Sequence, residues 1–202
     1  MKKNSVILII VFFLLFFKTN ESADITSIMN SSLEALSYYY IQTNDELSNG
    51  ILFTNSTGLI DKKQYPLIPG SVNNNALWNY NGSEQKTEYW IYIHVSNTGI
   101  SLCHGATNHL CSNPGCIGDE NYIIPINNAK WSKSFVNTQY EPSLINAIPF
   151  TIGFDNSHKI VEYLAEDKTI YFRYWLDVPP SVPPYIYNTT YQIMAVVGGN
   201  DC

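Results

Sequence analysis

The stretch that decides the fold runs from residue 169 to residue 202: TIYFRYWLDVPPSVPPYIYNTTYQIMAVVGGNDC. Every second residue from Ile170 to Val178 is apolar or aromatic, which is the pattern of a strand with one face on a core. Four prolines follow within residues 179–184, and they end the strand because proline has no N–H to give to a sheet. Residues 191–197 form the next apolar run, so the stretch predicts two strands joined by a turn.

The composition also favours β structure. The chain has 15 Tyr, 9 Phe and 4 Trp among many Ile, Val and Thr, which are residues that strands prefer. Periodic apolar segments predict further strands at residues 88–96, 122–126, 143–154 and 159–164. We therefore expect an all-β domain over residues 38–202, an Ig-like or jelly-roll-like β-sandwich of about eight to ten strands.

A secretory signal peptide is predicted at residues 1–23. Lys2 and Lys3 precede an apolar run at residues 6–17, and a polar segment ending at Ala23 follows it. The run is shorter than the roughly 20 residues that a membrane-spanning helix needs, so cleavage after Ala23 is preferred to a retained transmembrane anchor. The sequence thus predicts a secreted or cell-surface protein with residues 24–37 as an N-terminal extension.

The charge argues against nucleic acid as a partner. The whole chain has a net charge of −6, and cleavage would remove three of its 11 basic and one of its 17 acidic residues, leaving about −8. Arg173 is the single arginine, so no basic stripe is available to neutralise phosphates or anionic lipid headgroups. In an exported chain, Asn-x-Ser/Thr motifs are candidate glycosylation sites, here Asn30, Asn55, Asn81 and Asn188.

Four cysteines in an exported chain predict disulfides. Three pairings are formally possible. Cys111 and Cys116 flank a Pro-Gly turn that can bring them within bonding distance, which leaves Cys103 to pair with Cys202.

A metal site is the rival interpretation of this region. Residues 103–116 contain His104 and His109 as well as three cysteines, which are possible ligands of zinc or copper. The spacing matches no strong zinc pattern, and thiols exported from the cell oxidise readily. We therefore expect disulfides, no metal and no cofactor.

No catalytic motif stands out. The chain has no G-x-S-x-G serine elbow, no H-E-x-x-H and no Cys-His pair with a thiol expected to be free. The carboxylate pairs Asp119–Glu120 and Glu166–Asp167 are interpreted as solvated turn residues, because neighbouring residues of a strand point to opposite faces. We expect no enzyme, and a secreted hydrolase with an unrecognised site is kept as an alternative.

Bulky residues on the second face of two predicted strands form a possible interaction surface. They need cover from a second layer, a loop or a neighbouring subunit, or they could bind a cell-surface glycan by ring stacking. The residues are Trp90, Tyr92, Tyr171, Arg173 and Trp175.

Several segments resemble a largely uncharacterised group of secreted single-domain β-sandwich proteins that is common in archaea. The similarity covers about residues 40–202, and its most specific part is YFRYWLDVP with the following YNTT, together with a cysteine after the early strand and one at the end. The resemblance implies a sandwich module and supports the Cys103–Cys202 pairing. It brings no catalytic residue.

A more distant analogy links the fold to surface filaments in which an N-terminal segment of one subunit completes the sheet of the next. The candidate donor segment is residues 24–37, which contain Ile25, Ile28 and Met29. We therefore expect a structural or adhesive surface protein that is able to self-assemble by strand exchange. A glycan-binding module is the alternative from another class.

Overall fold

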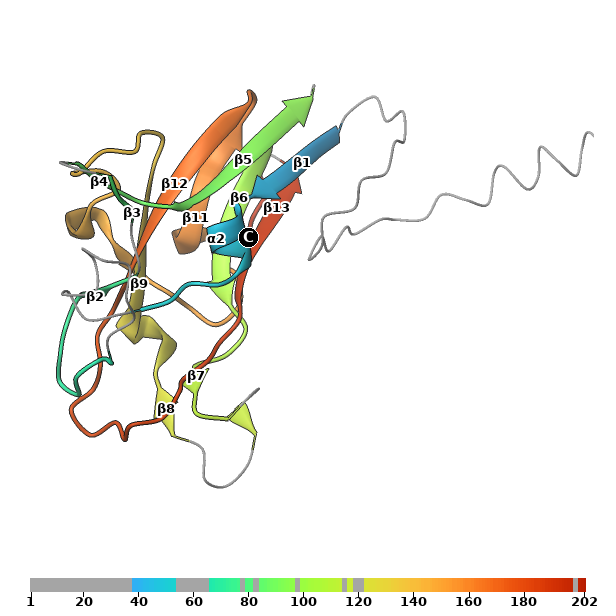
Figure 1. Cartoon of the computed structure of the whole chain (residues 1–202). Helices are drawn as coiled ribbons and strands as arrows, with labels where there is room; N and C mark the ends of the chain where they lie inside the picture. Colours follow the sequence, from blue (N-terminus) through green and yellow to red (C-terminus); the bar gives the residue numbers. More distant parts are fainter. Residues whose placement is uncertain are drawn as a thin grey trace, which may run out of the picture.

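The structure is a computed structural model with two antiparallel sheets packed face to face (Figure 1). This arrangement confirms the prediction of an all-β sandwich. The signal peptide and the donor segment predicted at residues 1–23 and 24–37 lie outside the described residues. The described ranges are residues 38–53, 66–76, 79–81, 84–96, 99–113, 116–117, 122–197 and 200–202.

The larger sheet has six strands. Five run in the order β1-β5-β12-β9-β10, and β2 pairs with the C-terminal end of β12. All pairings are antiparallel. The strands are β1 (Tyr38–Thr43), β2 (Asn74–Asn75), β5 (Tyr89–Ser96), β9 (Ala129–Ser134), β10 (Ile148–Pro149) and β12 (Lys168–Leu176).

The smaller sheet has three strands in the order β11-β6-β13, with bounds Lys159–Leu164, Ile100–Ala106 and Tyr191–Val197. Two short hairpins lie outside both sheets, β3 (Asn79–Asn81) with β4 (Glu84–Lys86) and β7 (Leu110–Cys111) with β8 (Ile123–Ile124). The described helices are single turns, α2 (Asp45–Ser48), η3 (Ile126–Asn128), η4 (Leu144–Asn146) and η5 (Asn156–His158).

The core lies between the two sheets and follows the period-2 pattern of the strands. On β5, the residues from Tyr89 to Val95 are alternately buried and half-buried. Phe172 and Tyr174 of β12 face the same core, and Ile100 and Leu102 of β6 close it from the other sheet. Burial of these side chains stabilises the fold by roughly 2 kcal/mol each before the cost of ordering the chain.

The connections fix which edges of the two sheets lie together. β5 leads directly into β6, and β11 leads directly into β12. Since β5 lies between β1 and β12, and β6 lies between β13 and β11, the edges β1 and β13 fall on one side of the sandwich (Figure 1). We call this the β1/β13 side and the opposite one the β10/β11 side.

Some predicted strands are wrong in detail. Residues 143–154 contain η4 and the two-residue β10, because Pro149 has no N–H with which to continue the ladder. Residues 122–126 contain only the two-residue β8. The strands expected at residues 88–96, 159–164, 169–178 and 191–197 are confirmed within two residues by β5, β11, β12 and β13.

Candidate functional site

The four cysteines form the two predicted disulfides. Cys103 of β6 is bonded to Cys202, with their Cα atoms 6.0 Å apart, and Cys111 is bonded to Cys116, with Cα atoms 5.2 Å apart. No cysteine is free. These bonds fit an extracellular protein, and no helix in the described ranges is long and apolar enough to cross a membrane.

The two histidines of the rival metal interpretation have different surroundings. His104 points into the core, where its ring contacts Trp131 at 4.8 Å and Phe150 at 4.7 Å between centroids. Burial lowers the pKa of His104 to about 3, with a smaller contribution from His158, so this imidazole is neutral. His109 accepts the N–H of Ile126 through Nδ1 at 3.1 Å. Among the described residues, no three metal-ligating side chains gather at one point.

Two of the five residues of the predicted interaction surface are interior. Arg173 and Trp175 are each 3 % exposed, so the interpretation of these two residues as surface is wrong for the single chain. The loop of residues 135–147 folds back over the outer face of β12, and the Arg173 guanidinium donates to the carbonyls of Thr138 at 2.5 Å and Gln139 at 3.2 Å. A loop therefore supplies the cover that the sequence left open for Arg173.

The guanidinium donates to two backbone carbonyls of this loop. Burial lowers the pKa of Arg173 to about 10, partly offset by the nearby carboxylate of Glu141, and the side chain stays charged at neutral pH. A buried cation needs acceptors, and the two carbonyls of the loop provide them. The Arg173 side chain thus has a structural role, because it links β12 to this loop.

Trp90, Tyr92 and Tyr171 remain half-buried on the outer face of the larger sheet. Tyr92 belongs to a cluster that sequence reasoning missed, which we call the Tyr92 cluster and which consists of Tyr40, Tyr92, His94 and Asp167. The Tyr92 hydroxyl donates to Asp167 Oδ2 at 2.8 Å, and His94 Nδ1 lies 2.9 Å from the same oxygen. The Tyr40 ring stacks on His94 with 5.1 Å between centroids.

Asp167 is more than a solvated turn residue. The N–H of Val95 donates to its Oδ1 at 3.0 Å, so three donors from β5 orient the carboxylate. These hydrogen bonds, that of His94 first, lower the pKa of Asp167 to about 2. The bond to Asp167 in turn raises the pKa of Tyr92. The other predicted pair, Asp119–Glu120, lies outside the described residues.

A serine, a histidine and an aspartate meet at η5 but do not form a catalytic relay. Ser157 Oγ lies 2.8 Å and Asp155 Oδ1 lies 2.7 Å from the same ring nitrogen, Nδ1 of His158. His158 Nε2 contacts the carbonyl of Pro149 at 2.8 Å. In a relay, the serine and the acid contact opposite nitrogens of the imidazole. Here Asp155 also accepts the N–H of Ser157, and the group caps a helical turn.

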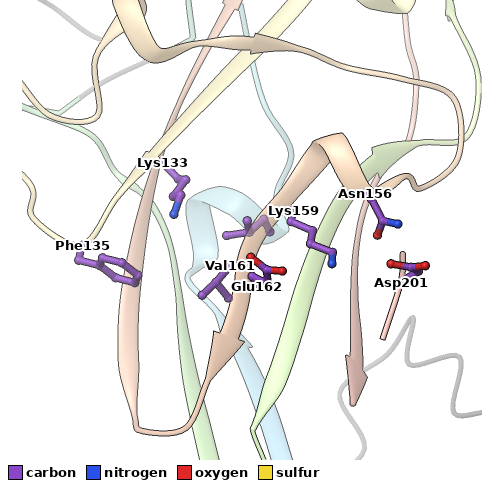
Figure 2. A pocket seen from close by; sticks show the side chains of 8 residues that line it. Lys133, Phe135, Asn156, Lys159, Val161, Glu162 and Asp201 are labelled. Carbon is purple, nitrogen blue, oxygen red and sulfur yellow. The ribbon is translucent and has the colours of Figure 1, made fainter. Parts of the chain in front are cut away.

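A pocket of about 490 Å³ opens between β9 and β11 on the β10/β11 side (Figure 2). Lys133 Nζ lies 5.2 Å above the Phe135 ring on one wall, and burial lowers the pKa of this lysine. Figure 2 shows Lys159 and Glu162 on the β11 wall and Asp201 beyond them. Two ammonium groups and two carboxylates cancel in charge, so the pocket favours neither an anionic nor a cationic ligand.

The glycosylation motifs differ in position. The side chain of Asn188 is exposed, next to the bridge between its backbone and that of Cys111. Asn81 lies at the end of β3, while Asn30 and Asn55 lie outside the described residues. Use of these motifs stays a prediction.

Comparisons of the chain with protein-family models, with curated proteins and with solved structures return no match.

Proposed function

We propose that the chain is an exported structural or adhesive protein of the cell surface, and that its subunits assemble by adding a strand to β13. The observation that carries the proposal is the unprotected edge of the smaller sheet. In the described part of the chain, β13 pairs only with β6, and the register runs without interruption from Tyr191 to Val197. This edge has no charged residue and no proline.

The opposite edge of the same sheet, β11, has structural features that prevent strand addition. The pairing of β11 with β6 has two register shifts, and the strand contains the charged Lys159 and Glu162. Natural sheets blunt exposed edges with such bulges and charges, because an unpaired row of N–H and C=O groups attracts other strands. A long, regular and uncharged edge therefore supports a role in pairing.

The core along β13 is also incompletely covered. Ile193 and Ala195 pack against the core but stay partly exposed, whereas Ile100 and Leu102 of the neighbouring β6 are at most 1 % exposed. β1, on the same side of the sandwich, is likewise an edge strand without charge or proline. An added strand would cover apolar surface as well as satisfy backbone groups.

Residues 24–37 are the proposed donor. In extended form these 14 residues would reach about 45 Å, and a seven-residue strand needs only about 23 Å. Their Ile25, Ile28 and Met29 would supply apolar side chains to the partly exposed core of the next subunit. The segment directly precedes β1 in the sequence, and β1 lies on the side of the acceptor edge.

The test compares the mature chain beginning at residue 24 with a chain beginning at residue 38, by size-exclusion chromatography and negative-stain microscopy. We expect the longer chain to form polymers and the shorter one to stay monomeric. A synthetic peptide of residues 24–37 should bind the shorter chain, and a scrambled peptide of equal composition should not. A monomeric longer chain with no peptide binding would contradict the proposal.

A further inference from the structure

We propose that the Tyr92 cluster is a binding site for a neutral pyranose sugar. The site lies on the outer face of β1 and β5, apart from the backbone edge of β13 on the other sheet, so the inference does not rest on the proposed assembly. It assigns the sugar hydroxyls to Asp167 and the apolar ring face of the sugar to Tyr40. Three steps support it.

The first step is the chemistry of the carboxylate. Asp167 is ionised and accepts hydrogen bonds only, and each of its oxygens has two acceptor positions. Oδ2 receives Tyr92 and His94, but Oδ1 receives the Val95 N–H alone among the described residues. With 42 % of the side chain exposed, Asp167 offers solvent an acceptor whose direction is already fixed. A sugar hydroxyl is the matching donor.

The second step is the ring next to the carboxylate. Tyr40 is 47 % exposed although it stacks on His94 at an interplanar angle of 26° and lies 6.1 Å from the Tyr92 ring. Cross-strand pairing of Tyr40 with His94 holds the ring on a sheet rather than on a loop. A fixed, half-exposed aromatic ring beside a hydrogen-bonding group combines an apolar body with polar contacts at small entropic cost.

The third step is the charge of the surroundings. The next residue along the chain, Lys168, pairs with Glu166 at 2.6 Å, and Asp167 is the negative group of the cluster. An anionic glycan would be repelled by this carboxylate, and an apolar protein surface would bury an ionised group whose Oδ1 still has an acceptor position to fill. A neutral polyol replaces the water on Asp167 with hydroxyl donors and meets neither penalty.

The neighbouring half of the same sheet face gives the contrast. There, the loop of residues 135–147 holds Arg173, and neither Arg173 nor Trp175 is exposed. In the Tyr92 cluster, by contrast, Tyr40 is 47 % exposed and the Asp167 side chain is 42 % exposed. This loop also provides the matched control, Tyr140, whose side chain is 74 % exposed and has no carboxylate partner in the described chain.

The experiment is saturation-transfer NMR on the folded chain with the methyl glycosides of glucose, galactose and mannose, followed by titration of the best binder. Glucuronic acid and choline serve as anionic and cationic probes. We expect at least one neutral glycoside to bind, and Asp167→Asn and Tyr40→Ala each to weaken it at least tenfold. Tyr140→Ala should leave the affinity within twofold of the unchanged chain.

Asp167 also holds the turn between β11 and β12, so Asp167→Asn is judged together with Tyr40→Ala, which leaves that turn intact. Thermal unfolding of each variant separates lost binding from lost folding. Failure of all three neutral glycosides to bind would overturn the proposal, as would stronger binding of glucuronic acid or of choline. Neutral binding that survives Tyr40→Ala in a folded protein would overturn it too.

Discussion

The two lateral sides of the sandwich differ in how the chain closes them. On the β10/β11 side, a segment that follows β10 runs from one sheet to the other, and its Thr151 and Gly153 exchange hydrogen bonds with Ala106 of β6 at 3.0 and 2.8 Å. On the β1/β13 side, each edge strand has one hydrogen-bonded neighbour within the described ranges. Among the described residues, the chain's own backbone closes the β10/β11 side, and the β1/β13 side is the one on which we propose strand addition.

The last residues of the chain strengthen this asymmetry. After β13, the chain reaches Cys202, which is bonded to Cys103 on β6, and the N–H of Cys202 donates to Asn156 Oδ1 at 2.9 Å. Asn156 begins η5, directly before β11. The C-terminal segment therefore leaves the β13 edge and is fastened towards the β10/β11 side.

Replacing Cys103 and Cys202 with serine should have the largest effect on stability. The bond closes a loop of 99 residues, and its loss should lower the free energy of unfolding by about 4–5 kcal/mol in the chain-entropy model. Replacing Cys111 and Cys116, five residues apart, should cost only about 2 kcal/mol. Urea unfolding under non-reducing conditions measures both. Equal losses of stability in the two double variants would show that the Cys103–Cys202 bond does not hold the β10/β11 side closed.

The next largest effect on stability should come from a change of pH, through His104 in the core. Its pKa is about 3 in the folded chain because burial disfavours the charged ring, whereas the ordinary pKa of histidine is 6.5. Between these values the unfolded chain binds a proton that the folded chain does not, so stability is lost as the pH falls from 6.5 towards 3. The loss is on the order of 1 kcal/mol per pH unit, reaching on the order of 4 kcal/mol.

Unfolding measurements between pH 4.5 and 6.5 isolate this effect. The lowered pKa values of Asp155 and Asp167, both about 2, change stability mainly below the ordinary aspartate pKa of 3.8. His104→Phe should therefore flatten the pH dependence in this window. An unchanged slope in His104→Phe would contradict the assignment of acid sensitivity to the core.

The sequence predicts the strands that are rich in apolar and aromatic residues and misses the others. β12 is visible because apolar residues alternate along it, and β13 because it is an almost continuous apolar run. β9, AKWSKS, is not, because its alanine, lysine and serine residues are not strand formers. In the structure Lys130 pairs with Asp177 at 2.5 Å, and Trp131 is 1 % exposed. These contacts come from distant segments, so the local pattern does not contain them.

The Tyr92 cluster could not be predicted for the same reason. Asp167 lies 75 residues from Tyr92 and 73 from His94, and a pair such as Glu166–Asp167 is typical of any solvated turn. The need of Arg173 for cover was predictable from strand alternation alone. The identity of the covering loop, residues 135–147, was not, because the contacts of Arg173 with Thr138 and Gln139 join residues 34–35 positions apart.

The next smaller effect on stability should come from replacing a glycine on β6. A Cβ on Gly105 would lie 2.0 Å from the carbonyl oxygen of Gly153, where the backbone of the β10/β11 side crosses β6. Backbone cannot swing aside, so Gly105→Ala should cost about 2–3 kcal/mol by overpacking. Gly99→Ala would meet only the ring of Tyr163, which is able to rotate, and should cost less. Thermal unfolding compares the two, and a milder Gly105→Ala would contradict the close crossing.

The smallest effect on stability should come from a charge on the unprotected edge, and it should have the clearest effect on assembly. Val196 is half-buried on β13, and Val196→Lys should change the free energy of unfolding by less than about 1 kcal/mol. A lysine there would add the charge that protected edges have, and chromatography of the mature chain should then show monomers. Ile152→Lys, on the β10/β11 side at a residue 53 % exposed, is the control and should still assemble. If Ile152→Lys blocked assembly and Val196→Lys did not, the acceptor edge would lie on the β10/β11 side.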